Sequence, residues 1–123
     1  MDGQFNHVNL EYLNDISGGD SNFKAELIGI FLKQIPDFIR NLHRFLIDDE
    51  IENLAKEAHT AKSSVLIFMM EKTGKNLKKI QLLEENNETD EILPIILEVQ
   101  DELNSAAKEL KAYVRELELV KKD

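Results

Sequence analysis

The segment Ala58 to Ser64, AHTAKSS, brings together residue types that could carry out chemistry at phosphorus. His59 supplies an imidazole, which is a competent nucleophile near pH 7 when it is neutral. Lys62 follows one helical turn later, where its ammonium group would stabilise negative charge on a transferring phosphoryl group. Ser63, four positions after the histidine, is small enough to keep the ring accessible. This spacing makes His59 the candidate phosphoacceptor, assisted by Lys62 and Ser63.

A helical wheel places His59 at the boundary between the buried and exposed sides of its segment. The centre of the apolar stripe lies about 120° from His59 on an ideal helix. Leu66 and Met70 lie within about 20° of the histidine direction, two and three turns further on. We therefore expect both to be exposed beside the histidine and to form a docking surface together with Lys56. The stripe itself comprises Leu54, Ala58, Ala61 and Val65.

The other two histidines have no distinctive neighbourhood in the sequence. His7 falls within the first predicted helix and His43 on the polar side of the second. An isolated surface histidine usually has no special chemical role. We therefore assign neither of them to the candidate site.

Nearly the whole chain has the periodicity of amphipathic helices, and no segment alternates as a strand does. Asp20 or Ser21 is expected to cap the second helix, and Asp49 with Glu52 resembles a capping box for the third. Pro36 should kink the second helix without ending it, because the apolar spacing continues on both sides. The expected helices are Asn6–Ile16, Asp20–Ile47, Asp49–Phe68, Met70–Leu83 and Asp90–Val120.

These helices and their short connections predict an all-α fold for residues 1–123 as one domain. The expected architecture is an antiparallel, up-and-down four-helix bundle with a short extra N-terminal helix. The 42% hydrophobic content is sufficient for a core without disulfides, and the chain has no cysteine.

Charge and hydropathy narrow the classes of partner. The net charge of −9 disfavours nucleic acid, although the segment from Lys56 to Lys79 has six lysines against two glutamates, a local charge of +4. The first ten residues, MDGQFNHVNL, do not resemble a signal peptide. No apolar run approaches the roughly 20 residues that span a bilayer. We expect a cytoplasmic monomer that binds neither nucleic acid nor membrane.

The segment Ala58 to Met70 resembles the signature of histidine-containing phosphotransfer (HPt) domains. That signature has a histidine, a lysine three positions later, a small residue that is usually Gly, and then Ser; His59, Lys62 and Ser64 match it. Ser63 stands where Gly is usual. Met69 stands where many members have a second Gly that ends the histidine helix, so we expect the third and fourth helices to run together, with a weak break near Gly74.

The resemblance implies a phosphocarrier in a two-component phosphorelay. His59 would receive a phosphoryl group from a receiver aspartate or a sensor histidine kinase and pass it to a response regulator. Such a domain has no nucleotide site or kinase activity of its own and needs no cofactor, since Mg²⁺ belongs to the partner receiver domain.

Three alternatives remain open at this point. The same surface could dock a receiver or kinase domain without being phosphorylated. A metal-binding bundle would need glutamates that project into the core, whereas the glutamates here are expected on outer faces. The last helix could also form a coiled coil with a second chain, because its apolar spacing would allow pairing.

Overall fold

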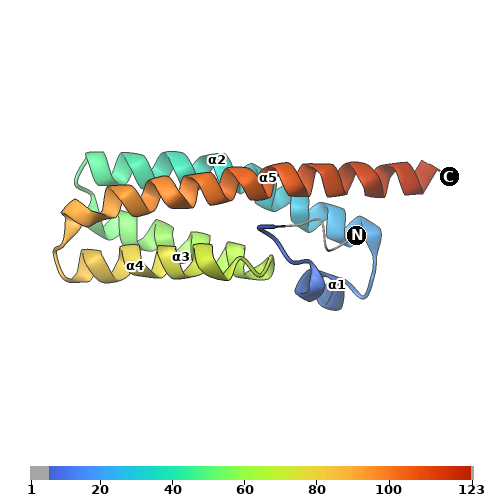
Figure 1. Cartoon of the computed structure of the whole chain (residues 1–123), viewed down its shortest axis with the longest axis horizontal. Helices are drawn as coiled ribbons and strands as arrows, with labels where there is room; N and C mark the ends of the chain where they lie inside the picture. The colour runs from blue at the N-terminus through green and yellow to red at the C-terminus, as the bar shows by residue number, and fades with distance from the viewer. Residues whose placement is uncertain (1–5, 123) are drawn as a thin grey trace.

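The computed structural model describes residues 6–122, and these residues form helices and turns without a strand. The predicted all-α class is therefore confirmed for this part of the chain. A 3₁₀ turn, η2 (Thr89–Glu91), precedes the last helix. The five α-helices pack together (Figure 1) and are α1 (Glu11–Ser17), α2 (Ser21–Ile47), α3 (Ile51–Ile67), α4 (Glu71–Glu85) and α5 (Ile92–Lys122).

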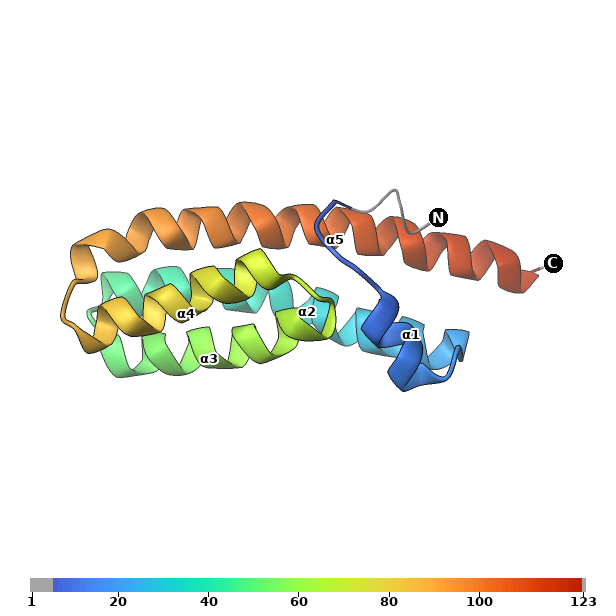
Figure 2. The ribbon, with the colours of Figure 1, turned by 60° about the horizontal axis from the view of Figure 1, so that its bottom comes forward.

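The four longer helices enclose the apolar interior. Helix α3 contacts α2 and α4, and α5 contacts the same two helices from the other side (Figure 2). The short helix α1 packs on α2. Helix α5 extends beyond the other three long helices at its C-terminal end in both views (Figures 1 and 2). This arrangement leaves the outer faces of α3 and α4 next to each other on one side of the molecule.

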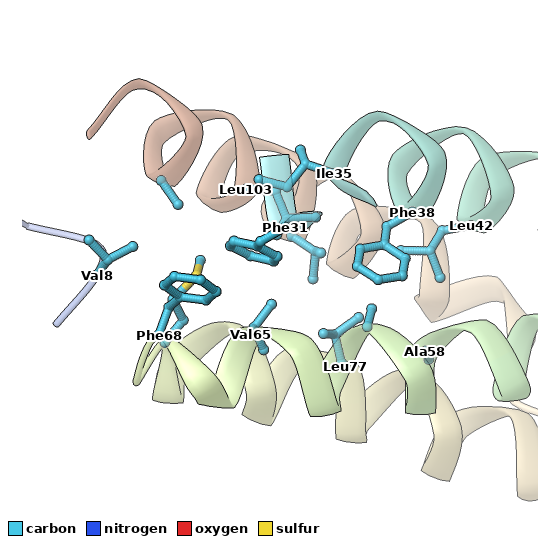
Figure 3. Packing of buried hydrophobic residues seen from close by; sticks show 14 of the residues in the cluster. Val8, Phe31, Ile35, Phe38, Leu42, Ala58, Val65, Phe68, Leu77 and Leu103 are labelled. Atoms are coloured by element: carbon cyan, nitrogen blue, oxygen red, sulfur yellow. The ribbon is translucent and has the colours of Figure 1, made fainter. Parts of the chain in front are cut away.

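The apolar stripes predicted from the sequence form the core. Figure 3 shows the ring of Phe31 from α2 stacked on that of Phe68 at the end of α3, with 4.5 Å between their centroids. On α5 the stripe is buried within this chain, so it is not available for pairing with a second copy along that length. The buried apolar residues of α5 are Ile92, Ile96, Val99, Leu103, Ala106 and Leu110.

One polar cluster interrupts this core. Glu102 on α5 is buried, contrary to the expectation that glutamates occupy only outer faces. Its Oε1 accepts a hydrogen bond of 3.2 Å from the Asn76 side chain of α4. Its Oε2 lies 3.7 Å from Nζ of Lys72, within ion-pairing range. A buried carboxylate is tolerable in this position because it is partnered.

The first four helices end in the same way. Each is followed by a residue with positive φ, and the next backbone N–H donates to a carbonyl five residues earlier, the pattern of a Schellman motif. The left-handed residues are Gly18, Asp49, Met69 and Asn87. Glycine favours this conformation most strongly, but Asn and Asp also tolerate it. Met69, with φ of 54°, is the bulky exception.

This pattern corrects two predictions about helix boundaries. Asp49 does not open α3 as a capping-box residue: it closes α2, and Glu50 precedes α3 without a side-chain cap. Helices α3 and α4 do not run together, because the left-handed turn at Met69 separates them. Gly74 lies inside α4 and causes no break. At the start of α2, Asp20 caps the helix as predicted by accepting from the N–H groups of Asn22 and Phe23.

The segment before α1 is not helical, so the first helix begins at Glu11 and not at Asn6. Val8 and Leu10 from this segment are buried in the core. The N–H of Asn9 donates to the carbonyl of Phe68 at 3.0 Å. The segment therefore fixes α1 beside the end of α3.

Candidate functional site

His59 lies on the outer face of α3 and is exposed to solvent. Its neighbours Ala58 and Ala61 are fully buried, so the core side of α3 faces away from the ring. The imidazole makes no side-chain hydrogen bond with any residue that the structure describes. The ring is thus exposed and not engaged by the described part of the chain, as a nucleophile requires.

The hydroxyl groups near His59 are turned toward their own helix. Ser63 Oγ donates to the carbonyl of His59 at 3.3 Å, and Thr60 Oγ1 donates to the carbonyl of Lys56 at 3.1 Å. This is the back-bonding that serine and threonine commonly adopt within helices. As a result, neither hydroxyl projects over the imidazole. The exposed Lys56 lies before His59 and the partly exposed Lys62 after it.

An apolar hollow begins one turn beyond His59. It has a volume of about 390 Å³ and lies where α1 meets the end of α3. Leu66 is 42% exposed, as the sequence predicted for a docking residue, and Tyr12 of α1 is 47% exposed. The lining residues are Tyr12, Ser63, Leu66, Ile67, Met69 and Glu71. Tyr12 was not among the docking residues predicted from the sequence, because local spacing does not show that α1 meets the end of α3.

Met70 does not belong to this surface, and its predicted exposure is wrong. Its side chain is buried, with 3% of its area exposed. The helical-wheel extrapolation fails because α3 ends at Ile67, before Met70 is reached. Met70 instead follows the left-handed residue, a position whose side chain commonly packs on the helix it has just left. The Met70 N–H donates to the carbonyl of Val65 at 3.1 Å. The side chains of Val65 and Met70 are both buried.

A second, smaller hollow of about 260 Å³ lies on the other side of Leu66, between α3 and α4. Lysines of both helices line it together with Gly74. A Cβ at Gly74 would lie only 3.1 Å from Cδ2 of Leu66, so the glycine allows the leucine to rest on α4. The lining residues are Lys62, Leu66, Glu71, Gly74, Lys75 and Lys78. The sequence offered one signal for Gly74, because glycine inside a helix often marks close packing.

The remaining histidines have structural partners. His43 Nε2 is hydrogen-bonded to the side-chain oxygen of Gln100 at 2.7 Å, which links α2 to α5. His7 lies before α1, not within it, and its Nδ1 is 2.6 Å from Oε2 of Glu109 on α5. Local spacing does not predict this pairing, because His7 and Glu109 are 102 positions apart along the chain.

The carboxylate of Glu109 is held at the N-terminal segment by several donors. The backbone N–H groups of His7 and Val8 donate to its Oε1 at 3.0 and 3.3 Å. Burial raises the pKa of Glu109, but the hydrogen bonds from the His7 ring and from backbone N–H groups outweigh it, so the pKa lies below its ordinary value. The ionised form of Glu109 is therefore the one that the folded structure favours.

Within residues 6–122, no group of three or more His, Asp or Glu side chains is arranged to hold a metal ion. None of the helices described there is long and apolar enough to cross a membrane. Comparison of the chain with models of protein families, with curated proteins and with solved structures gives no match.

Proposed function

We propose that this protein is a histidine phosphotransfer domain of a two-component phosphorelay. His59 accepts a phosphoryl group from a receiver aspartate or a sensor histidine kinase and passes it to a response-regulator receiver domain. The observation that carries the proposal is the exposed ring of His59, which lacks a hydrogen-bond partner among the described residues. The rings of His7 and His43, by contrast, are bound to side chains of the protein itself.

The transfer step follows from the chemistry of the His59 imidazole and the aspartyl phosphate of the receiver. An unprotonated ring nitrogen of His59 attacks phosphorus in the aspartyl phosphate; the new P–N bond forms as the P–O bond breaks, and the carboxylate leaves. The ammonium group of Lys62, one turn away, counters charge on the phosphoryl oxygens. The Mg²⁺ that assists the reaction belongs to the partner receiver. Leu66 and the apolar hollow beside it would dock that partner, with Lys56 at the opposite end of the site.

Two departures from the HPt pattern are compatible with this function. Ser63 turns its hydroxyl back to the carbonyl of His59, which leaves the approach to the ring open. Met69 adopts the left-handed conformation in which a glycine would be favoured, so the histidine helix still ends there. Each departure therefore has a local structural account.

We also propose the setting in which this chemistry takes place. The contacts of α2 and α4 with both α3 and α5 support an up-and-down four-helix bundle with α1 as an additional N-terminal helix. We propose that the protein acts as a cytoplasmic monomer, and that it carries the phosphoryl group without a kinase activity or a nucleotide site of its own.

The test is incubation of the purified protein with a panel of receiver domains phosphorylated by a small-molecule phosphodonor, followed by mapping of acid-labile phosphate. We expect label on His59 and none on the His59→Gln variant, whose fold is checked by circular dichroism. His7→Gln and His43→Gln serve as matched controls and should accept label as the parent does. Receiver binding without any label on His59 would support the adaptor instead.

A further inference from the structure

The hollow between α3 and α4 has a distribution of charge unlike that of the whole molecule. The chain has a net charge of −9, yet three lysines and one glutamate line this hollow, a local charge of +2. Among side chains that the structure describes, none forms an ion pair with Lys62, Lys75 or Lys78. Lys72, also on α4, differs because it pairs with Glu98 and Glu102. Their positive charge is therefore available to another molecule.

The floor of the hollow is apolar. Leu66 rests against Gly74: a Cβ at position 74 would lie 3.1 Å from Leu66 Cδ2, so the leucine would have to shift by a few tenths of an ångström. Lys75 and Lys78 project from the same side of α4, one turn apart, and Lys62 faces them from α3. The result is an apolar notch with ammonium groups on both sides.

We propose that this lysine-rimmed notch binds an acidic segment of a partner protein that carries an apolar side chain. The apolar side chain would contact Leu66 while carboxylates pair with Lys75 and Lys78. The volume of about 260 Å³ is below the range typical of drug-sized ligands and suits a protein side chain better. The inference goes beyond phosphotransfer and does not depend on phosphorylation of His59.

Other polyanions fit these features less well. The net negative charge of the chain repels any polyanion, but the phosphates of a nucleic acid gain nothing from an apolar floor in return. An acidic protein segment uses both the lysines and the leucine. Charge complementarity at such a rim acts mainly on the rate of association and on the choice of partner.

The probe is a short fluorescein-labelled peptide composed of Glu and Leu, titrated into the full-length protein and followed by fluorescence anisotropy. Reversal of two charges in Lys75→Glu/Lys78→Glu should weaken binding on the order of tenfold at low salt. The matched control is Lys108→Glu/Lys111→Glu, which changes two exposed lysines at the same spacing on α5. The Lys108→Glu/Lys111→Glu variant should bind the peptide with an affinity within about twofold of the parent, because salt screens most of the effect of charges away from the notch.

Two further measurements separate a loss of peptide binding from a loss of phosphotransfer and from unfolding. The His59→Gln variant should bind the peptide as the parent does, so failure of the phosphotransfer proposal and failure of this one are distinguishable. Circular dichroism establishes that both double variants are folded. The proposal is overturned if the peptide does not bind, if both lysine pairs weaken binding equally, or if a peptide with Gln in place of Glu binds as well. Tighter binding of a short DNA duplex at the same lysines would also overturn it.

Discussion

The backbone N–H of Met70 donates to the carbonyl of Val65 at 3.1 Å, across a left-handed residue that is a methionine. This bond closes α3 and starts the turn into α4, next to the apolar hollow. The left-handed conformation costs a residue with a Cβ about 1–2 kcal/mol, and glycine avoids most of that cost.

Replacing Met69 by glycine should therefore stabilise the protein. We expect a gain of roughly 0.5–1 kcal/mol in the free energy of unfolding, because relief of strain is partly offset by the greater freedom of glycine in the unfolded chain. Urea denaturation, monitored by circular dichroism, measures this free energy of unfolding. Met69→Val, which is branched at Cβ, is the opposing control and should destabilise; an equal stability of both variants would show that the turn stores no strain.

Lys62→Ala should slow phosphoryl transfer to His59 while helix content stays the same. The ammonium acts on charge at the phosphoryl oxygens, and a partly exposed lysine in a helix contributes little to stability. Transfer rates from a labelled receiver, measured at low salt, provide the test. Lys111→Ala, an exposed lysine on α5, is the matched control. Equal rates for both variants would remove Lys62 from the mechanism.

Leu66→Glu should weaken receiver binding strongly without unfolding the protein. Leu66 is 42% exposed and borders the apolar hollow, where a carboxylate would face the docking partner. Leu97→Glu on α5 is the control, since Leu97 is 47% exposed and α5 packs mainly on α2 and α4, not on the helix of His59. Titration calorimetry compares the two variants. Unchanged affinity of the Leu66 variant would move the docking surface elsewhere.

Ser63→Gly should leave transfer within a few-fold of the parent and lower stability by roughly half a kcal/mol, the cost of glycine within a helix. The Ser63 hydroxyl already bonds to the carbonyl of His59, so its removal opens little space over the ring. Single-turnover transfer and urea denaturation measure the two quantities. An acceleration of about a hundredfold would instead mean that Ser63 misplaces the reacting groups, for which a shift of about 1 Å is sufficient.

Glu109→Gln should destabilise the protein at neutral pH by about 1 kcal/mol, because a partly exposed carboxylate that accepts several hydrogen bonds is lost. The pKa of Glu109 is lowered in the folded state, so its contribution is present above the pKa of an unfolded glutamate, about 4.3, and is lost as the pH falls through the lower folded pKa. Unfolding free energies of parent and variant should therefore converge in acid. Glu116→Gln, an exposed α5 glutamate, should show no such trend.

The helices were predictable because apolar residues recur along the sequence at the spacing of a helix. The stripe of Leu54, Ala58, Ala61 and Val65 repeats at helical spacing and is buried as expected. The same periodicity correctly predicted the exposure of Leu66. It failed for Met70 because a helical wheel predicts exposure only within one helix. Methionine is not a residue type that indicates a left-handed turn, so the helix end at Met69 was not predictable. The contacts of Tyr12 and of His7 with distant helices depend on tertiary packing, which local spacing does not encode.

The position of Met69 has a practical consequence. Met69 borders the hollow beside Leu66 and also another hollow near Glu102, while the adjacent Met70 is buried in the core. The chain has only three methionines, the third being Met1. Labelling of methionine methyl groups with ¹³C would therefore give a nearly empty spectrum in which one resonance reports on occupancy of the surface and another on integrity of the core. A single sample could then separate partner binding from unfolding.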